Sequence, residues 1–61
     1  MTLINIEEWK AQYPNKCAII KLNPNQDGTG YLVEQSPRSG EALFKSHYEL
    51  QYGEKEGYSF I

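Results

Sequence analysis

The sequence predicts an α+β fold, in which a short N-terminal helix packs on a three- or four-stranded antiparallel sheet. Three observations lead to this prediction: a helix-capping pattern near the N-terminus, an apolar run at residues 16–22, and polar-apolar alternation from residue 42 onward. The chain has 61 residues, the size of one small domain, so we treat residues 1–61 as a single mini-domain.

The first predicted element is a helix over residues 6–12. Asn5 can accept a hydrogen bond from the first turn, and Glu8 follows three residues later, as in a capping box. Pro14 ends the helix because proline disfavours helical dihedral angles at the residue before it. A helix of two turns is unstable alone, so we expect it to dock through Trp9.

The next elements form a predicted hairpin. Residues 16–22 carry apolar side chains on both faces, a pattern typical of a strand in the middle of a sheet. Residues 23–30 are rich in turn formers, and Gly28 after Asp27 supplies a position that tolerates positive φ. Residues 31–33 then form a short second strand, so the two strands are joined by a long loop.

Residues 42–52 alternate almost strictly between two faces, which predicts a third strand. A helix is the alternative, because Phe44, Tyr48 and Tyr52 also recur at a spacing of four residues.

Polar segments separate these last elements. Residues 35–41 form a connection before the third strand, and residues 53–57 form a five-residue hairpin loop bounded by glycines. Residues 58–61 return as the final strand. The predicted order is therefore one helix followed by four strands.

Composition excludes several classes of protein. One cysteine and one histidine can form neither an intrachain disulfide nor a four-ligand zinc site. A formal net charge of −2 has the wrong sign for electrostatic binding of phosphate, and no apolar run approaches the length of a membrane span. We expect a folded, cytoplasmic protein without a leader, membrane anchor or cofactor.

The first loop partly matches a calcium-binding loop. Asn23, Asn25, Asp27, Gly28 and Glu34 occupy positions 1, 3, 5, 6 and 12 of the EF-hand spacing. Strands flank this loop where an EF-hand has helices, so we predict an ordinary turn and no metal.

The segment from Gly28 to Leu32 (GTGYL) resembles the Gly-aromatic-Gly-aromatic-Ile motif of cold-shock domains. The resemblance implies a sheet that binds single-stranded nucleic acid, with Tyr31, Phe44 and Tyr58 as the stacking aromatics. Nucleic-acid binding through a cold-shock or OB-like sheet is therefore the alternative function.

No set of residues predicts catalysis. On a strand, Ser46 and His47 would point to opposite sides, and a solvent-facing His47 lacks an oriented partner. Cys17 stands on the predicted core strand, where a small buried hydrophobe is expected. We therefore expect no enzyme activity.

Tyrosines and acidic residues gather in the C-terminal third, and protein interfaces favour aromatic anchors surrounded by polar groups. The alternative is that the tyrosines cover the core with their hydroxyls in water. The predicted protein-binding residues are Tyr48, Tyr52, Tyr58, Glu49, Glu54 and Glu56. We expect a small module that binds a larger protein, as phage and mobile-element inhibitors or modulators of host proteins do. A homodimer through exposed sheet edges is a further expectation.

Overall fold

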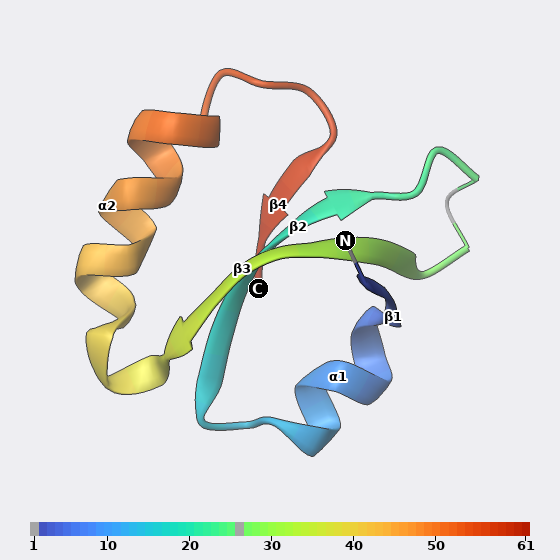
Figure 1. Ribbon diagram of the computed structural model, residues 1–61, viewed down its shortest axis with the longest axis horizontal. Helices are drawn as coiled ribbons and strands as arrows, with labels where there is room; N and C mark the ends of the chain where they lie inside the picture. Colours follow the sequence, from blue (N-terminus) through green and yellow to red (C-terminus); the bar gives the residue numbers. More distant parts are fainter. Residues whose placement is uncertain (1, 26) are drawn as a thin grey trace.

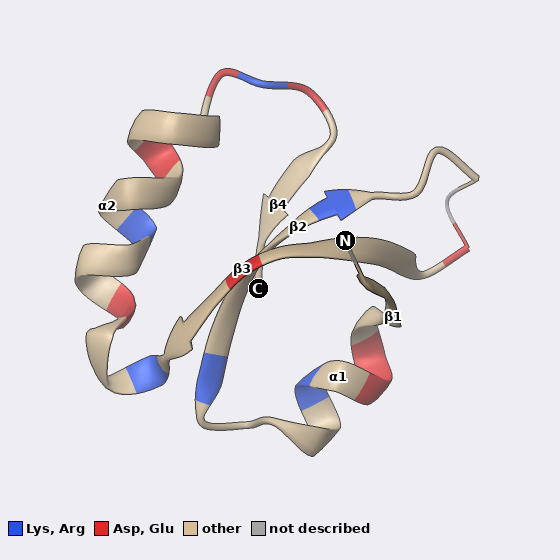
Figure 2. Cartoon of the chain, in the orientation of Figure 1, with Lys and Arg blue, Asp and Glu red and all other residues tan. Residues whose placement is uncertain are grey.

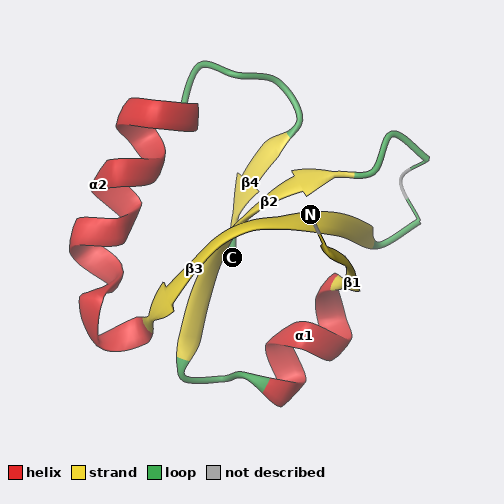
Figure 3. Ribbon diagram, in the orientation of Figure 1, coloured by secondary structure: helices red, strands yellow, loops and turns green. Residues whose placement is uncertain are grey.

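The computed structural model describes residues 2–25 and 27–61 and shows a four-stranded antiparallel sheet with two helices (Figures 1 and 3). The elements in chain order are β1 (Thr2–Asn5), α1 (Ile6–Gln12), β2 (Lys16–Leu22), β3 (Thr29–Pro37), a 3-10 turn (Arg38–Gly40), α2 (Glu41–Tyr52) and β4 (Tyr58–Phe60). The strand order across the sheet is β1-β3-β2-β4. The predicted α+β fold is thus confirmed, with four strands.

The two helices lie on opposite sides of the sheet (Figure 1). The strand register agrees, because Ile19 pairs with Glu34 of β3 and Phe60 of β4 on the side that faces α2. Ile20 follows Ile19 and therefore faces the side where α1 lies. Having a helix on each side explains why Cys17, Ala18, Ile19 and Ile20 are all fully buried. The prediction that β2 is a central strand is confirmed.

Helix α1 forms where predicted. The Asn5 side chain accepts a hydrogen bond from the Glu8 backbone N–H at 3.1 Å, and the Tyr13 N–H closes the last turn on the Trp9 carbonyl. Trp9 is the buried residue of the helix and is 7% exposed. The helix therefore docks through Trp9, as expected.

Residues 42–52 are the main correction, because they form most of α2 and not a strand. Glu41, Ala42, Leu43 and Lys45 are strong helix formers. The helical alternative of four-residue spacing holds, with Phe44, His47, Tyr48 and Tyr52 half-buried on the inner side. Residues four apart lie on one face both of a helix and of a strand, so Phe44, Tyr48 and Tyr52 fit both patterns. This overlap is why the segment was predicted as a strand.

Three other boundaries differ from the prediction. Strand β1 was not predicted, because four residues are too few to show a periodic pattern. Strand β3 extends from Thr29 to Pro37, beyond the predicted 31–33, and pairs with both β1 and β2. The loop at 53–57 connects α2 to β4 and is not a hairpin loop, since β4 pairs with β2.

Candidate functional site

The three predicted tyrosines come together between α2 and β4. The ring centroids of Tyr52 and Tyr58 lie 4.9 Å apart, and those of Tyr48 and Tyr52 lie 6.4 Å apart. Phe60 of β4 completes the cluster, at 5.7 Å from Tyr48 and 5.8 Å from Phe44. These five half-buried rings are the main apolar contact between α2 and the sheet.

The tyrosine hydroxyls also hold the helix. Tyr48 Oη donates to the Tyr58 backbone carbonyl at 3.3 Å, and Tyr52 Oη donates to the Glu34 carboxylate at 2.9 Å. Both bonds run from α2 to a strand. The rings cover the core, as the alternative expects, but the hydroxyls of Tyr48 and Tyr52 bond to protein groups instead of lying in water.

Glu34 joins the same cluster from β3. Its Oε2 lies 2.9 Å from His47 Nε2, which donates when that nitrogen is protonated. This bond, together with the one from Tyr52, lowers the pKa of Glu34, and the carboxylate raises the pKa of Tyr52. His47 is half-exposed and, contrary to the expectation of an unpartnered side chain, is oriented by Glu34.

Of the predicted acidic residues, Glu49 lies in the C-terminal half of α2, and Glu54 and Glu56 lie in the loop between α2 and β4 (Figure 2). Glu49 and Glu54 line an open hollow of about 570 Å³ at the C-terminal end of α2, together with Leu50, Gln51 and Lys55. Glu56 lines a different hollow, beside Leu22. All three acids are exposed, and in residues 2–25 and 27–61 none of them has an ion-pair partner.

Leu43 and Leu50 are the residues that the sequence prediction missed. Their side chains are 82% and 83% exposed, and they stand seven residues apart, on one side of α2. Their spacing of seven residues is visible in the sequence, but it places the two side chains on one side only if the segment is a helix. The outer face of α2 thus carries two leucines, with Glu49 and Glu54 at its C-terminal end.

The nucleic-acid candidates are not arranged as cold-shock domains require. Phe44 lies on α2, where its ring packs on Phe60, and Tyr58 packs on Tyr52. Tyr31 lies on β3, opposite Lys21 of β2. The sheet is open and carries a helix on each side, so its architecture differs from the cold-shock-like sheet that the resemblance implies, while nucleic-acid binding itself stays a prediction.

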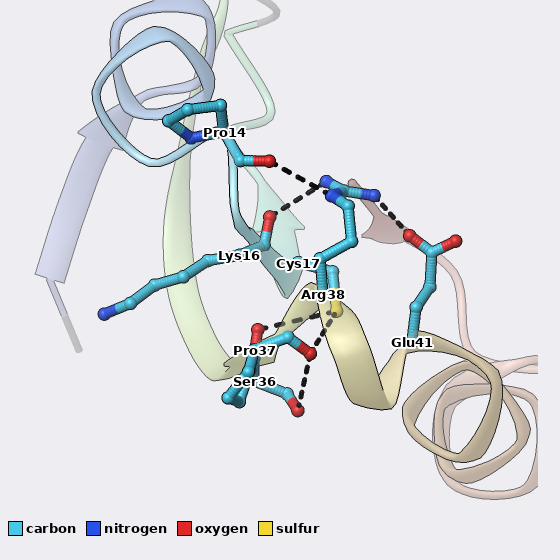
Figure 4. A network of polar contacts seen from close by, with 7 residues as sticks. All are labelled: Pro14, Lys16, Cys17, Ser36, Pro37, Arg38 and Glu41. Carbon is cyan, nitrogen blue, oxygen red and sulfur yellow. Dashed lines mark hydrogen bonds and ion pairs between the residues drawn. The ribbon is translucent and has the colours of Figure 1, made fainter.

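An arginine ties the start of α2 to the rest of the protein (Figure 4). Arg38 Nε donates to the Pro14 carbonyl at 3.3 Å, and its Nη2 donates to the Lys16 carbonyl at 2.8 Å. Nη1 pairs with the carboxylate of Glu41. One guanidinium therefore joins the segment between α1 and β2 to the first residue of α2.

Cys17 lies beside this arginine and is fully buried. Its Sγ contacts the Ser36 carbonyl at 3.6 Å, and burial raises the pKa of the thiol. A raised pKa leaves less thiolate, which is the nucleophilic form. The expectation that Cys17 is a buried core residue is confirmed.

The loop between β2 and β3 does not gather the calcium-like positions. Asn23 Oδ1 accepts from the Asn25 N–H, and Asp27 accepts from both the N–H and the hydroxyl of Thr29. Glu34, at the last position of the EF-hand spacing, contacts His47 and Tyr52 of α2. The described part of the chain contains no group of three His, Cys, Asp or Glu side chains placed to hold a metal ion.

Neither helix has the length and hydropathy needed to cross a bilayer, within those same residues.

Comparisons with protein-family models, curated proteins and solved structures find no match to this chain. Any proposal about function therefore depends on the surface chemistry described above.

Proposed function

We propose that this protein is a small, non-enzymatic binding module that docks on a larger protein through the outer face of α2. The exposed pair Leu43 and Leu50 supports this proposal most directly. A helix that presents apolar residues at i and i+7 matches the way amphipathic helices enter apolar grooves of partner proteins.

Charge identifies the kind of groove. Two acidic side chains, those of Glu49 and Glu54, stand at the end of the leucine face. The matching partner surface is an apolar groove with lysine or arginine on its rim, which would also speed association. Glu56 adds to this charge at longer range, while Tyr48, Tyr52 and Tyr58 support the surface from beneath by holding α2.

The activity we propose is inhibition or modulation of that partner in the cytoplasm, as small phage and mobile-element proteins act on host proteins. A reducing compartment suits a chain whose one cysteine is a free thiol. A homodimer is not needed for this activity.

The test is a nuclease-treated pull-down from source-cell lysate with the wild-type chain and the Leu43→Ser/Leu50→Ser variant. We expect one protein at near-equal stoichiometry, lost with the double variant, because central interface anchors contribute about 2 kcal/mol or more each. Leu22→Ser, which changes a leucine away from α2, is the matched control. Circular dichroism checks that each variant is folded.

A second arm tests the charge. Glu49→Lys/Glu54→Lys should weaken the captured complex and reverse its salt dependence, whereas Glu7→Lys on α1 should change neither. Equal capture by the leucine variant would contradict the proposal. Recovery of nucleic acid that nuclease removes would instead support the stacking alternative of Tyr31, Phe44 and Tyr58.

A further inference from the structure

Strand β1 forms one edge of the sheet, and part of its backbone is available for pairing. The Ile6 N–H donates to the Gly28 carbonyl at 3.0 Å, which continues the β1 to β3 ladder. Backbone groups in an antiparallel ladder alternate in direction, so Ile4 also faces β3 and Leu3 faces away. The N–H and C=O of Leu3 and the N–H of Asn5 therefore point outward from the sheet.

The other side of β3 supports this assignment. The Asn23 N–H donates to the Thr29 carbonyl at 3.2 Å, so Thr29 faces β2. Thr29 pairs with Asn5 in the register of β1 and β3. Since the groups of Thr29 are used toward β2, those of Asn5 must be directed away from β3.

The opposite edge of the sheet is different. The Ala18 and Ile61 backbones exchange hydrogen bonds at 3.0 and 2.9 Å, so the backbone groups of Ile61 face β2. Because backbone groups alternate in direction along a strand, the carbonyl of Tyr58, three residues earlier, points away from β2. That carbonyl accepts the Tyr48 hydroxyl from α2. The β4 edge is therefore partly satisfied by the protein itself. Neither β1 nor β4 carries a charged residue or a proline, two of the protections of an edge strand, so the Tyr48 hydroxyl is what distinguishes the β4 edge from β1.

A hollow of about 230 Å³ lies beside the β1 edge, between β1 and α1. Ile4 and the nearly buried ring of Trp9 give it an apolar surface. Glu8 and Gln12, one helical turn apart on α1, form its polar side. Within the part of the chain that the structure describes, the Glu8 carboxylate has no ion-pair partner.

From this arrangement we infer that β1 and α1 bind an extended segment of another polypeptide, which adds as a fifth strand beside β1. Its backbone pairs with Leu3 and Asn5, and one apolar side chain enters the hollow over Trp9. Alternate side chains of a strand point to the same side, so a lysine or arginine two positions away reaches Glu8. Strand addition of this type obtains affinity from the main chain and specificity from such a side-chain hollow.

The charge of the hollow favours a foreign segment over a second copy of this chain. The β1 sequence, Thr-Leu-Ile-Asn, contains no basic residue, so a second β1 strand offers Glu8 no counter-ion. This surface is separate from the outer face of α2, and the inference stands or fails independently of the proposed function.

The test uses the full chain and a fluorescein-labelled peptide of alternating valine and lysine, titrated by fluorescence anisotropy. Leu3→Pro removes the outward N–H while leaving the bonds to β3, since proline is accepted on an edge strand where its nitrogen faces solvent. We expect Leu3→Pro to weaken binding at least tenfold and Leu3→Ala, which keeps the N–H, to weaken it less than threefold. Glu8→Gln should weaken binding severalfold, with Glu7→Gln as the matched control.

Amide hydrogen exchange of the complex gives an independent readout, in which Leu3 and Asn5 become protected. Equal binding by Leu3→Pro, or no binding at millimolar peptide, would overturn the inference. A dimer in light scattering that Leu3→Pro converts to a monomer would also overturn it, in favour of a second copy as the occupant.

Discussion

Glu34 on β3 and His47 on α2 are joined by a 2.9 Å contact between Oε2 and Nε2, although they stand 13 residues apart in the chain. The same carboxylate oxygen accepts the Tyr52 hydroxyl. Helix α2 contains no buried residue, so these polar bonds, the half-buried rings and the pair between Arg38 and Glu41 hold it. The attachment of α2 should therefore depend on pH.

Glu34→Gln should lower the free energy of unfolding at pH 7 by about 0.5–1 kcal/mol. The pKa of Glu34 is depressed in the folded state, so its stabilisation is present above the ordinary glutamate pKa of about 4.3 and is lost as pH falls through the folded pKa. Urea unfolding at several pH values should show the difference from wild type at neutral pH and its disappearance in strong acid. Glu49→Gln, on the outer side of α2, should leave the dependence of the free energy of unfolding on pH unchanged.

Tyr52→Phe should alter how the free energy of unfolding depends on pH in the alkaline range. The Glu34 carboxylate raises the pKa of Tyr52 in the folded protein. The stabilisation from the Tyr52 to Glu34 bond is therefore present below the ordinary tyrosine pKa and is lost as pH rises through the pKa of Tyr52 in the folded state. An ultraviolet absorbance titration of the five tyrosines should lose its most alkaline component in Tyr52→Phe. Tyr13→Phe keeps the Tyr52 to Glu34 bond and should retain that component; its loss there would contradict the assignment.

Ile19 should be among the most sensitive positions of the fold. It is fully buried, and removing its side chain as Ile19→Ala costs about 2–5 kcal/mol, comparable with the whole stability of a domain this small. Ile19→Val should cost about 0.5–1.5 kcal/mol and remain folded. Leu43→Ala, at an 82% exposed leucine, should change stability by less than about 0.5 kcal/mol in the same thermal melts.

Arg38→Ala should destabilise the protein by about 1–3 kcal/mol, because it leaves the Pro14 and Lys16 carbonyls without the charged donor that they share. Arg38→Lys keeps the charge but not the planar fork, so it should recover less than half of that loss. Chemical denaturation measures both variants. Full recovery by lysine would show that charge, and not geometry, is what Arg38 supplies.

Gly57→Ala should cost about 1 kcal/mol. Its φ of +84° is unfavourable for L-residues, while a Cβ there would meet nothing within 4 Å, so the penalty belongs to the backbone alone. A synthetic chain with D-alanine at position 57 should be at least as stable as wild type in thermal melts. An equal loss with both enantiomers would indicate a steric cause instead.

The N-terminal half of the fold was largely predictable from sequence because its information is local. Asn5 and Pro14 mark the ends of α1, and the apolar run from Cys17 to Ile20 has the composition of a strand covered on both faces. The hairpin followed from the turn at Gly28. Local patterns were enough because capping and turn preferences act over a few residues.

The C-terminal half was less predictable because tertiary contacts decide it. Aromatic residues at 44, 48 and 52 satisfy both periods, and only docking on Phe60 and Glu34 selects the helix. Tyr48 and Tyr52 were predicted as interface anchors because they cluster with Tyr58 and acidic residues; the structure packs both rings between α2 and β4, and their role in binding stays a prediction. Leu43 and Leu50 were overlooked because residues 42–52 were predicted as a strand. Residues seven apart point to opposite faces of a strand, whereas they lie on the same side of a helix.

Cys17 gives this protein a natural reporter of its own opening. The thiol is the only one in the sequence and is fully enclosed between β2, the end of β3 and Arg38. Cys17 pairs with Ser36 near the end of the β2–β3 ladder, so a thiol reagent can modify the chain only when this end of the ladder opens. Fraying of the β1 edge would not change the labelling rate, whereas a ligand that slows labelling must stabilise the β2–β3 pair beside Arg38 and not only its own surface.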